Sequence, residues 1–138
     1  MQLTKNFTLN EMTYSSTAVA NDIDNRPSVA VVENLKRLCV NVLQPLREHY
    51  NCPVIISSGY RCVELNKKVG GARNSQHLLG EAADFIIPSK SLKDVFEWIR
   101  LNLEYDQLLY EYNSRCRWIH VSFHSGLNRR QCIDNYKA

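Results

Sequence analysis

The sequence lacks any apolar run long enough to cross a membrane or to act as a signal peptide. Residues 1–28, MQLTKNFTLNEMTYSSTAVANDIDNRPS, contain no such run, and none follows later. We therefore expect a protein with no membrane span that is synthesised in the cytoplasm without a signal peptide. Release or export from the cell would then need separate machinery.

Paired cysteine motifs are also absent. The five cysteines are an odd number and include no CxxC pair, which argues against a cysteine-rich zinc site and favours reduced thiols. Cys39 lies on an apolar helical face and is expected in the core. Cys62 and Cys116 do not open a helix in a glycine-flanked context, so we reject a cysteine hydrolase.

Strong charge of one sign is missing as well. The net charge is +3, and no basic stripe alternates with aromatic residues, so a nucleic-acid partner is not expected. The hydrophobic fraction of 44% and the charged fraction of 22% are typical of globular proteins. A chain of 138 residues is long enough for one domain with a hydrophobic core, and we expect residues 1–138 to form it.

Helical signals occur in the first half of the chain and again near residue 91. The TLNE stretch at residues 8–11 is typical of a capping box that opens a short helix. An apolar stripe at helical spacing then begins at Pro27 or Ser28, and Pro45 should kink or shorten its end. A short helix should end at Gly70, and Ser91 should cap another amphipathic helix.

Strand signals separate these helices. Residues 53–60 (PVIISSGY) resemble a buried strand, and residues 82–87 form a second apolar strand that ends at Pro88. The last two, DQLLYEY and RWIHVSF, are joined by NSRC, a spacing that suits a hairpin. The pattern predicts an α+β domain in which a mostly antiparallel sheet carries helices packed on one face.

Three side chains suggest a metal site. His77 precedes a turn-prone glycine, Asp84 interrupts the apolar run AADFII, and His120 lies centrally on the polar face of the last strand. A carboxylate in an apolar run costs free energy unless something binds it. Two histidines and one carboxylate, with a fourth position left for water, are the usual catalytic zinc arrangement. Such a site would suit amide hydrolysis.

Spacing alone leaves a plainer interpretation open. Single histidines are often surface residues or hydrogen-bonded core residues, and Asp84 could pair with Arg61 or Arg73 instead of a metal.

The motifs themselves resemble a known family. SQHLLGEAAD matches the pattern Ser-x-His-x-x-Gly-x-Ala-x-Asp of the zinc D-Ala-D-Ala carboxypeptidases, peptidase family M15, and WIHVSF resembles that family's Trp-x-His strand. NFTLNEM, LQPLRE, ISSGYR, LNKKVGG and DQLLYE extend the similarity over residues 6 to 130. The pattern is closest to small, endolysin-like members. The resemblance implies a hedgehog-like and D-Ala-D-Ala-peptidase-like fold.

The resemblance also implies roles. His77, Asp84 and His120 would be the ligands of one Zn²⁺, and the substrate would be a peptidoglycan stem peptide cleaved as a D-Ala-D-Ala carboxypeptidase or an L-Ala-D-Glu endopeptidase does. Arg61 of SGYR would hold a substrate carbonyl or carboxylate, although an ion pair with Asp84 or Glu64 is the alternative.

Ser75 matches the motif serine and would bind substrate or simply cap its loop. Gln107 and Trp118 are further substrate-binding candidates. His124 could assist the site or be a surface residue. We expect a monomer that acts on the cell wall once it is released or exported.

One departure from the family bears on mechanism. Many relatives carry an acidic residue three positions before the second histidine, where this chain has Arg117. If Tyr112 pairs with Arg117 in the hairpin, Glu111 faces Trp118 and shares the face of His120, about 7 Å away on a diagonal. Glu111 is therefore our candidate general base. A one-residue shift of the register would turn it to the other face.

Other possibilities remain open. Glu111 could be a solvated strand residue, and Glu81 and Asp106 are weaker candidates for the base. The chain could also be a zinc-bearing binding domain, as in the hedgehog amino-terminal domain, or a structural protein that the metal stabilises.

Overall fold

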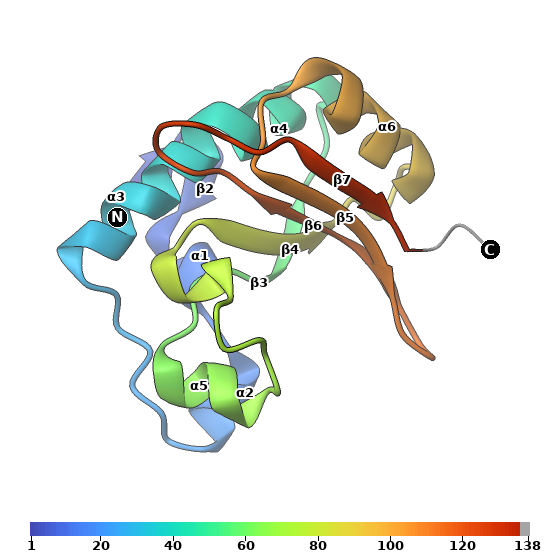
Figure 1. The fold of residues 1–138 in the computed structure, drawn as a ribbon. Coiled ribbons are helices and arrows are strands. Elements are labelled where there is room, and N and C mark those ends of the chain that lie inside the picture. The colour runs from blue at the N-terminus through green and yellow to red at the C-terminus, as the bar shows by residue number, and fades with distance from the viewer. Residues whose placement is uncertain (136–138) are drawn as a thin grey trace.

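A five-stranded sheet forms the centre of the protein. The computed structural model describes residues 1–135, and its sheet has the strand order β3-β4-β6-β5-β7 (Figure 1). The strands span Ile55–Ser58 (β3), Ala82–Ile86 (β4), Gln107–Tyr112 (β5), Arg117–Ser122 (β6) and Gln131–Asp134 (β7). The strands β4, β5 and β6 follow the predicted segments closely, and β5 and β6 form the predicted hairpin.

The prediction of a mostly antiparallel sheet is wrong, because the sheet is mixed. β3 pairs with β4, β4 with β6 and β5 with β6 in antiparallel fashion, but β7 joins the edge parallel to β5. No sequence signal predicted β7, which is only four residues long and half-exposed. The backbone N–H of Gln131 donates to the carbonyl of Asp106, which starts the added strand beside β5.

The other edge strand also differs from its prediction. The segment expected to be buried at residues 53–60 forms β3 only from Ile55 to Ser58, and Ile55 is 46% exposed. Because β3 pairs only with β4, it is an edge strand whose side chains have neighbours on one side.

The long helices cover one face of this sheet (Figure 1). They are α3 (Val29–Leu38), α4 (Gln44–Tyr50) and α6 (Leu92–Asn102). Ser28 caps α3 by accepting from the N–H of Val31, and Ser91 caps α6 by accepting from the N–H of Asp94, as the sequence predicts. None of the helices in the part of the chain that the structure describes is both long and apolar enough to span a membrane.

The predicted break at Pro45 takes a specific form. A π-helical turn, Cys39–Leu43, connects α3 to α4, and Pro45 lies in the first turn of α4. Proline is tolerated there because the first turn leaves backbone N–H groups without intrahelical partners. The wider π turn therefore leads into α4 without a break at the proline, so that α3, the π turn and α4 form one helical rod.

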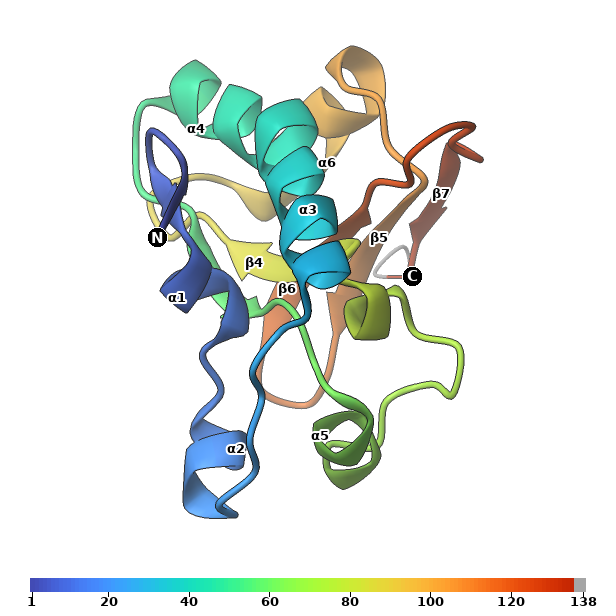
Figure 2. The same ribbon diagram turned by 90° about the vertical axis from the view of Figure 1, so that its left-hand side faces the viewer.

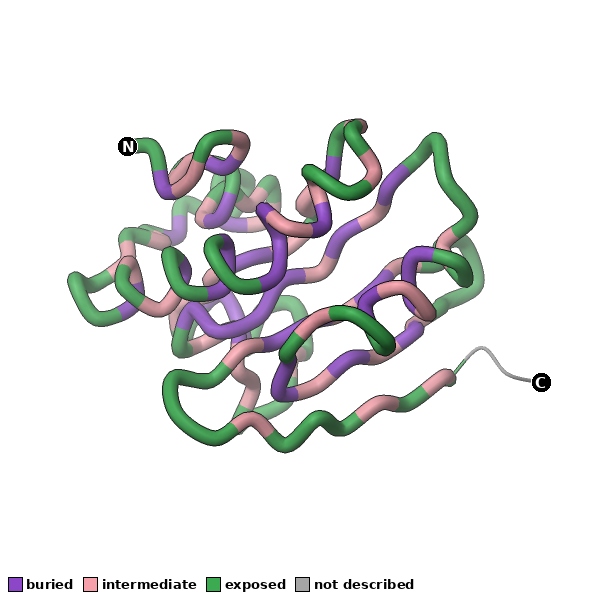
Figure 3. The backbone as a smooth tube through the Cα atoms, turned by 90° about the horizontal axis from the view of Figure 1, so that it is seen from above, coloured by how far each residue is buried: buried purple, intermediate pink, exposed green. Residues whose placement is uncertain are grey.

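The core lies between these helices and the sheet (Figure 3). Leu35, Leu38 and Leu43 from the helical rod are fully buried against Phe85 of β4. Cys39 is fully buried among them, and burial raises the pKa of its thiol to about 12. All five cysteines are free thiols.

A smaller N-terminal unit packs beside β3 (Figure 2). It contains β1 (Gln2–Thr4), β2 (Phe7–Thr8), α1 (Leu9–Thr13) and α2 (Ser16–Ala20), and α2 contacts α5 (Val63–Lys68). Thr8 and Glu11 form the predicted capping box of α1. The Asn25 amide ties this unit to the chain after β3, since it donates to the carbonyls of Thr13 and Tyr60.

Candidate metal centre

His77 is held in place by the turn around it. It lies in a short 3₁₀-helix, Gln76–Leu79, whose N-terminal residue Ser75 accepts a hydrogen bond from the N–H of His77. The turn ends at Gly80, which has a φ of +73° that favours glycine. The His77 ring is 2% exposed, and its Nδ1 donates to the carbonyl of Gly59 at 2.7 Å. This bond fixes the tautomer and leaves the lone pair on Nε2.

Strand pairing brings the other two candidate ligands together. Asp84 of β4 lies directly opposite His120 of β6, and the Nδ1 of His120 is 2.9 Å from Asp84 Oδ1. His77 Nε2 lies 3.3 Å from the same oxygen. Burial raises the pKa of Asp84, but the hydrogen bond from His120 and the nearby His77 imidazole outweigh it and hold that pKa well below its usual range. Asp84 is therefore an ionised carboxylate between two imidazoles.

The geometry fits a small divalent cation. One ligand atom from each of His77, Asp84 and His120 lies within 4.8 Å of the other two. Tetrahedral zinc holds nitrogen and oxygen ligands at about 2.0–2.1 Å, which places them about 3.3 Å from one another. His77 Nε2 is a buried nitrogen without a hydrogen-bond partner. Such an atom costs free energy unless a ligand binds it, and a metal ion would do so.

Arg61 lies beside this cluster. Its Nη2 is 3.9 Å from Asp84 Oδ2, its Nε donates to Ser58 Oγ, and its Nη1 donates to Asn66 Oδ1. The alternative of an ion pair with Asp84 is thus partly realised, but at a distance that leaves the guanidinium able to contact a second oxyanion.

Gly71 is required where the loop passes this guanidinium. A Cβ at Gly71 would overlap Asn66 Oδ1 and Arg61 Nη1. The pair Gly70-Gly71 therefore both ends α5 and makes room for Arg61. In the same loop Arg73 is exposed, so the sequence alternative in which it pairs with Asp84 finds no support.

The register of the β5–β6 hairpin places Glu111 on the sheet face that carries Asp84 and His120. Tyr112 pairs with Arg117, Glu111 with Trp118 and Leu109 with His120. Glu111 is therefore diagonal to His120 on the same face. Its Oε2 accepts a hydrogen bond from the side chain of Asn135 at 3.0 Å.

These groups line an open cleft of about 620 Å³, the metal cleft. Its wall includes all three candidate ligands, and Arg61, Glu111, Ser75, Gln107 and Trp118 also line it. Every site residue expected from the sequence thus borders one cavity. Ser75 has the loop-capping bond described above, and the Gln107 amide donates to Gln131.

The comparisons with known proteins bear on this cleft. The sequence model of the family described as Peptidase M15 matches residues 5–122. This chain belongs to the peptidase M15 family. M15 peptidases are metal-dependent, and the cluster of His77, Asp84 and His120 is where this member would hold its metal. No curated protein matches the chain closely enough to count as a relative.

Two other acidic residues are already bonded elsewhere in this M15 domain. Glu81 is buried, accepts from Gln76 and lies 2.9 Å from His124 Nδ1. Asp106 is buried and accepts from the backbone and the side chain of Arg129. Neither lines the metal cleft, whereas Glu111 does. His124 is half-exposed and pairs with Glu81.

Some residues that shape the site were not predicted from the sequence. Asn66 anchors Arg61, and the carbonyl of Gly59 orients His77. Arg129 also lines the cleft, and its Nη2 lies 3.5 Å from Gln76 Oε1 at the start of the 3₁₀-helix. Gly59 stands inside the SGYR motif, but a backbone carbonyl carries no signal in sequence. Cys62 does cap α5 by accepting from Leu65 N–H, contrary to the sequence analysis, but it packs on a small apolar cluster.

Proposed function

We propose that this M15 protein is a zinc peptidase that hydrolyses a peptide bond in the stem peptide of peptidoglycan. The observation that carries the proposal is the buried, unpartnered Nε2 of His77, which faces Asp84 and His120. A ring held this firmly by Gly59, with its free lone pair aimed at an ionised carboxylate, is preorganised for a cation. Two histidines and one carboxylate are also a common donor set of catalytic zinc sites.

The bound zinc would supply Lewis acidity, which polarises a carbonyl and lowers the pKa of a coordinated water to about 7. The chain's own groups then manage the proton and the substrate. Glu111 would accept a proton from the attacking water and deliver it to the amine of the departing peptide. Arg61 would hold the carbonyl or carboxylate of the substrate and stabilise negative charge as it develops.

The remaining cleft residues would hold the peptide. Trp118 offers an apolar ring beside His120, and Gln107 offers an amide farther along the same strand face. Ser75 has a hydroxyl proton free for a substrate carbonyl while its oxygen caps the 3₁₀-helix. An open cleft of this kind suits an extended peptide rather than a small enclosed metabolite. A monomer would suffice, because one chain supplies every group.

A second candidate function follows from Arg117. The chain has a cation where many relatives place their catalytic acid, and Arg117 is exposed at the start of β6. A domain that keeps the metal for binding or stability, without turnover, would show such a change. Glu111→Gln distinguishes the two functions, because a peptidase would lose turnover and keep its zinc, whereas a binding domain would be unaffected.

Mass spectrometry of peptidoglycan fragments tests the proposal. Purified fragments are incubated with the zinc-loaded protein, with protein plus chelator, and with His120→Ala. A zinc peptidase yields one new pair of fragments that is missing from both controls, and their masses identify the bond. Intact fragments in every arm, with one zinc bound per chain, would instead support the non-catalytic alternative.

A further inference from the structure

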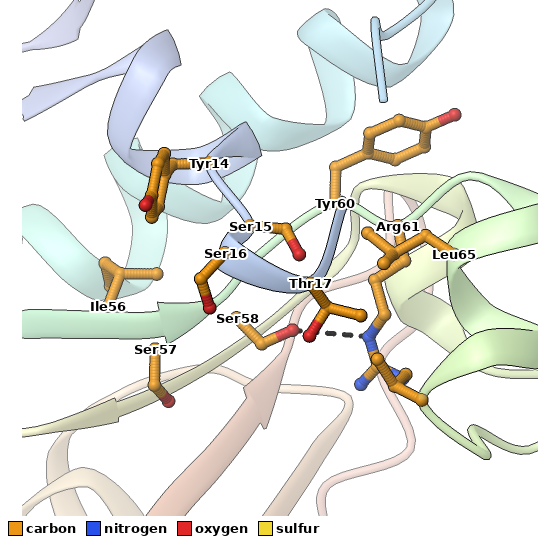
Figure 4. Close-up of a pocket in the computed structure, with 11 residues that line it drawn as sticks. Tyr14, Ser15, Ser16, Thr17, Ile56, Ser57, Ser58, Tyr60, Arg61 and Leu65 are labelled. Atoms are coloured by element: carbon orange, nitrogen blue, oxygen red, sulfur yellow. Dashed lines mark hydrogen bonds between the residues drawn. The ribbon is translucent and has the colours of Figure 1, made fainter. Parts of the chain in front are cut away.

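A second pocket shares Arg61 with the metal cleft. It has a volume of about 490 Å³ and is enclosed by α2, β3 and the start of α5 (Figure 4). Seven of its eleven lining residues carry a hydroxyl group. Ser58 bonds the guanidinium of Arg61, and Ser15, Ser16 and Thr17 line the same pocket (Figure 4).

The lining selects a neutral, polyhydroxylated ligand. Each hydroxyl can both donate and accept, which matches a ligand that carries donors and acceptors on the same atoms. Among the described residues that line this pocket none is acidic, so a cationic ligand has no counter-charge there. The single cation, Arg61, already bonds Ser58 and Asn66 and lies near Asp84. The pocket therefore offers one positive charge, whereas a polyanion needs several.

Apolar surface completes the match. The rings of Tyr14 and Tyr60 and the aliphatic side chains of Ile56, Leu65 and Val69 alternate with the hydroxyls. A sugar ring has both kinds of surface, because its hydroxyls lie at the edge and its C–H groups at the faces. Tyrosine suits such a ligand, since it offers an apolar ring and a polar tip.

The pocket is built and held open by bonds that its ligand would not need. Ser15 accepts from the N–H of Ala18, which fixes the start of α2. The Asn25 side chain bonds Thr13, Tyr60 and Cys62 and so clamps the two walls together. Ser16 is exposed and Thr17 half-buried, with hydroxyls available to solvent.

We propose that this pocket binds an amino sugar of the glycan strand to which the stem peptide is attached. The inference rests on the proposed function, because Arg61 is a wall common to this pocket and the metal cleft. A sugar in one pocket and a peptide in the other would both lie against the same arginine. The sugar pocket would thus fix which end of the stem peptide reaches the metal.

An NMR titration tests binding directly. The isotope-labelled full chain is titrated with N-acetylglucosamine, and the double variant Ser16→Ala/Thr17→Val and the control Ser89→Ala are titrated in parallel. Ser89 is exposed in the turn after β4 and lines neither pocket. We expect saturable shifts at the pocket residues of the wild type. The double variant should bind about tenfold more weakly because two hydrogen-bonding groups are lost, and Ser89→Ala should match the wild type.

The proposal is overturned if the wild type shows no saturable shifts or if the double variant binds equally well. Ser16→Trp offers a second route, since an indole at this exposed position would fill the pocket without removing a structural bond. It should abolish the sugar shifts, and retained shifts would count against the proposed location. This measurement needs no turnover, so it stands even if the peptidase proposal fails.

Hydrolysis gives a separate reading. The kcat/KM for a stem peptide that carries its amino sugar should fall about tenfold in the double variant, while the bare peptide is cleaved as by the wild type. An equal loss on both substrates would mean that the pocket contacts peptide, and would overturn the sugar assignment. If the wild type cleaves neither substrate, the peptidase proposal fails and the titration alone decides the pocket.

Discussion

At the scale of single residues, the candidate site depends on which polar groups are already satisfied. His77 is oriented by a backbone carbonyl and keeps one free nitrogen, whereas Glu81 and Asp106 are bonded to His124 and Arg129. Preorganised groups with unused lone pairs are the ones that can bind a ligand without first breaking a bond. This distinction separates His77 from Glu81 and Asp106.

Glu111→Gln tests the role of the carboxylate. Removing a general base lowers turnover by about 10²–10⁴-fold, because the proton of the attacking water has no acceptor. We expect kcat to fall by this amount while zinc content stays at the wild-type value, since Glu111 is not among the three ligands. Initial rates on a stem peptide and elemental analysis of the same sample measure both quantities.

The matched control is Glu33→Gln, which changes an exposed carboxylate on α3. Glu33→Gln should leave kcat and the zinc content unchanged. Full turnover by Glu111→Gln would remove the general-base role from this residue and return the question to the departure at Arg117.

Asp106 makes stability depend on pH. Hydrogen bonds from Arg129 outweigh burial and lower the pKa of Asp106 below its ordinary value, which is about 3.9 in the unfolded chain. The ionised carboxylate therefore stabilises the fold above that value, and the contribution is lost as the pH falls through the lower folded-state pKa.

We expect Asp106→Asn to lower the free energy of unfolding at pH 7 by about 1–3 kcal/mol, because charged hydrogen bonds to Arg129 are lost. The drop in stability between pH 5 and pH 3 should be smaller than in the wild type. Urea titrations at the three pH values measure it. Parallel pH profiles for the two proteins would show that other groups control acid unfolding.

At the scale of elements, antiparallel pairing does most of the assembly. The register of β4 with β6 places Asp84 against His120, and the register of β5 with β6 places Glu111 on the same face. The 3₁₀-helix brings His77 from a third direction. The loop that contains Gly71 then leaves space for Arg61.

Gly71→Ala should therefore disturb Arg61 and Asn66, the side chain that anchors it. The added methyl would overlap Asn66 and the guanidinium, so Arg61 must shift away from its position near Asp84. We expect kcat/KM to fall about tenfold or more with zinc content unchanged, since one positioned cation is displaced.

Arg73→Ala, an exposed change in the same loop, is the matched control and should behave as the wild type. Crystal structures of both variants would show whether the guanidinium has moved. An unmoved Arg61 with full activity in Gly71→Ala would contradict the steric argument.

Local patterns predicted most of the elements. The capping box at Thr8, the caps at Ser28 and Ser91, and the hairpin with its register follow from short-range chemistry and are present. β7 was not predicted by such local patterns, because a strand of four half-exposed residues is stabilised mainly by the sheet edge that it joins. The π-helical turn before Pro45 likewise depends on how the helical rod packs.

The site was predictable only in part. The motif around His77 and Asp84, and the strand carrying His120, are visible in the sequence, and the family match supports the resemblance. The carbonyl of Gly59, the Asn66 anchor and the hydroxyl-lined pocket are products of tertiary structure. No residue spacing encodes them, since they join segments that are distant in the chain.

At the scale of the whole molecule, the long helices cover one face of the sheet and leave the opposite face to the cleft (Figure 1). The three candidate ligands come from segments around residues 77, 84 and 120, so a bound metal would join parts of the chain that separate on unfolding. Metal binding should therefore stabilise the whole fold.

Zinc at a thousand times its dissociation constant would add about 4 kcal/mol to the free energy of unfolding and raise the Tm by roughly 10 °C. Calorimetry with zinc and with a chelator measures the difference. In His77→Ala the Tm should be almost the same with zinc and with a chelator. An equal Tm with and without zinc would mean that the metal does not bind the folded chain.

The most direct test of the account is the zinc content and position in the purified protein. We expect elemental analysis to give one zinc per chain, lost in His77→Ala, Asp84→Ala and His120→Ala but kept in His124→Ala. Anomalous diffraction at the zinc edge should place the ion between His77 Nε2, His120 Nδ1 and the Asp84 carboxylate. A metal-free protein in the presence of excess zinc, or an ion bound elsewhere, would contradict the central claim.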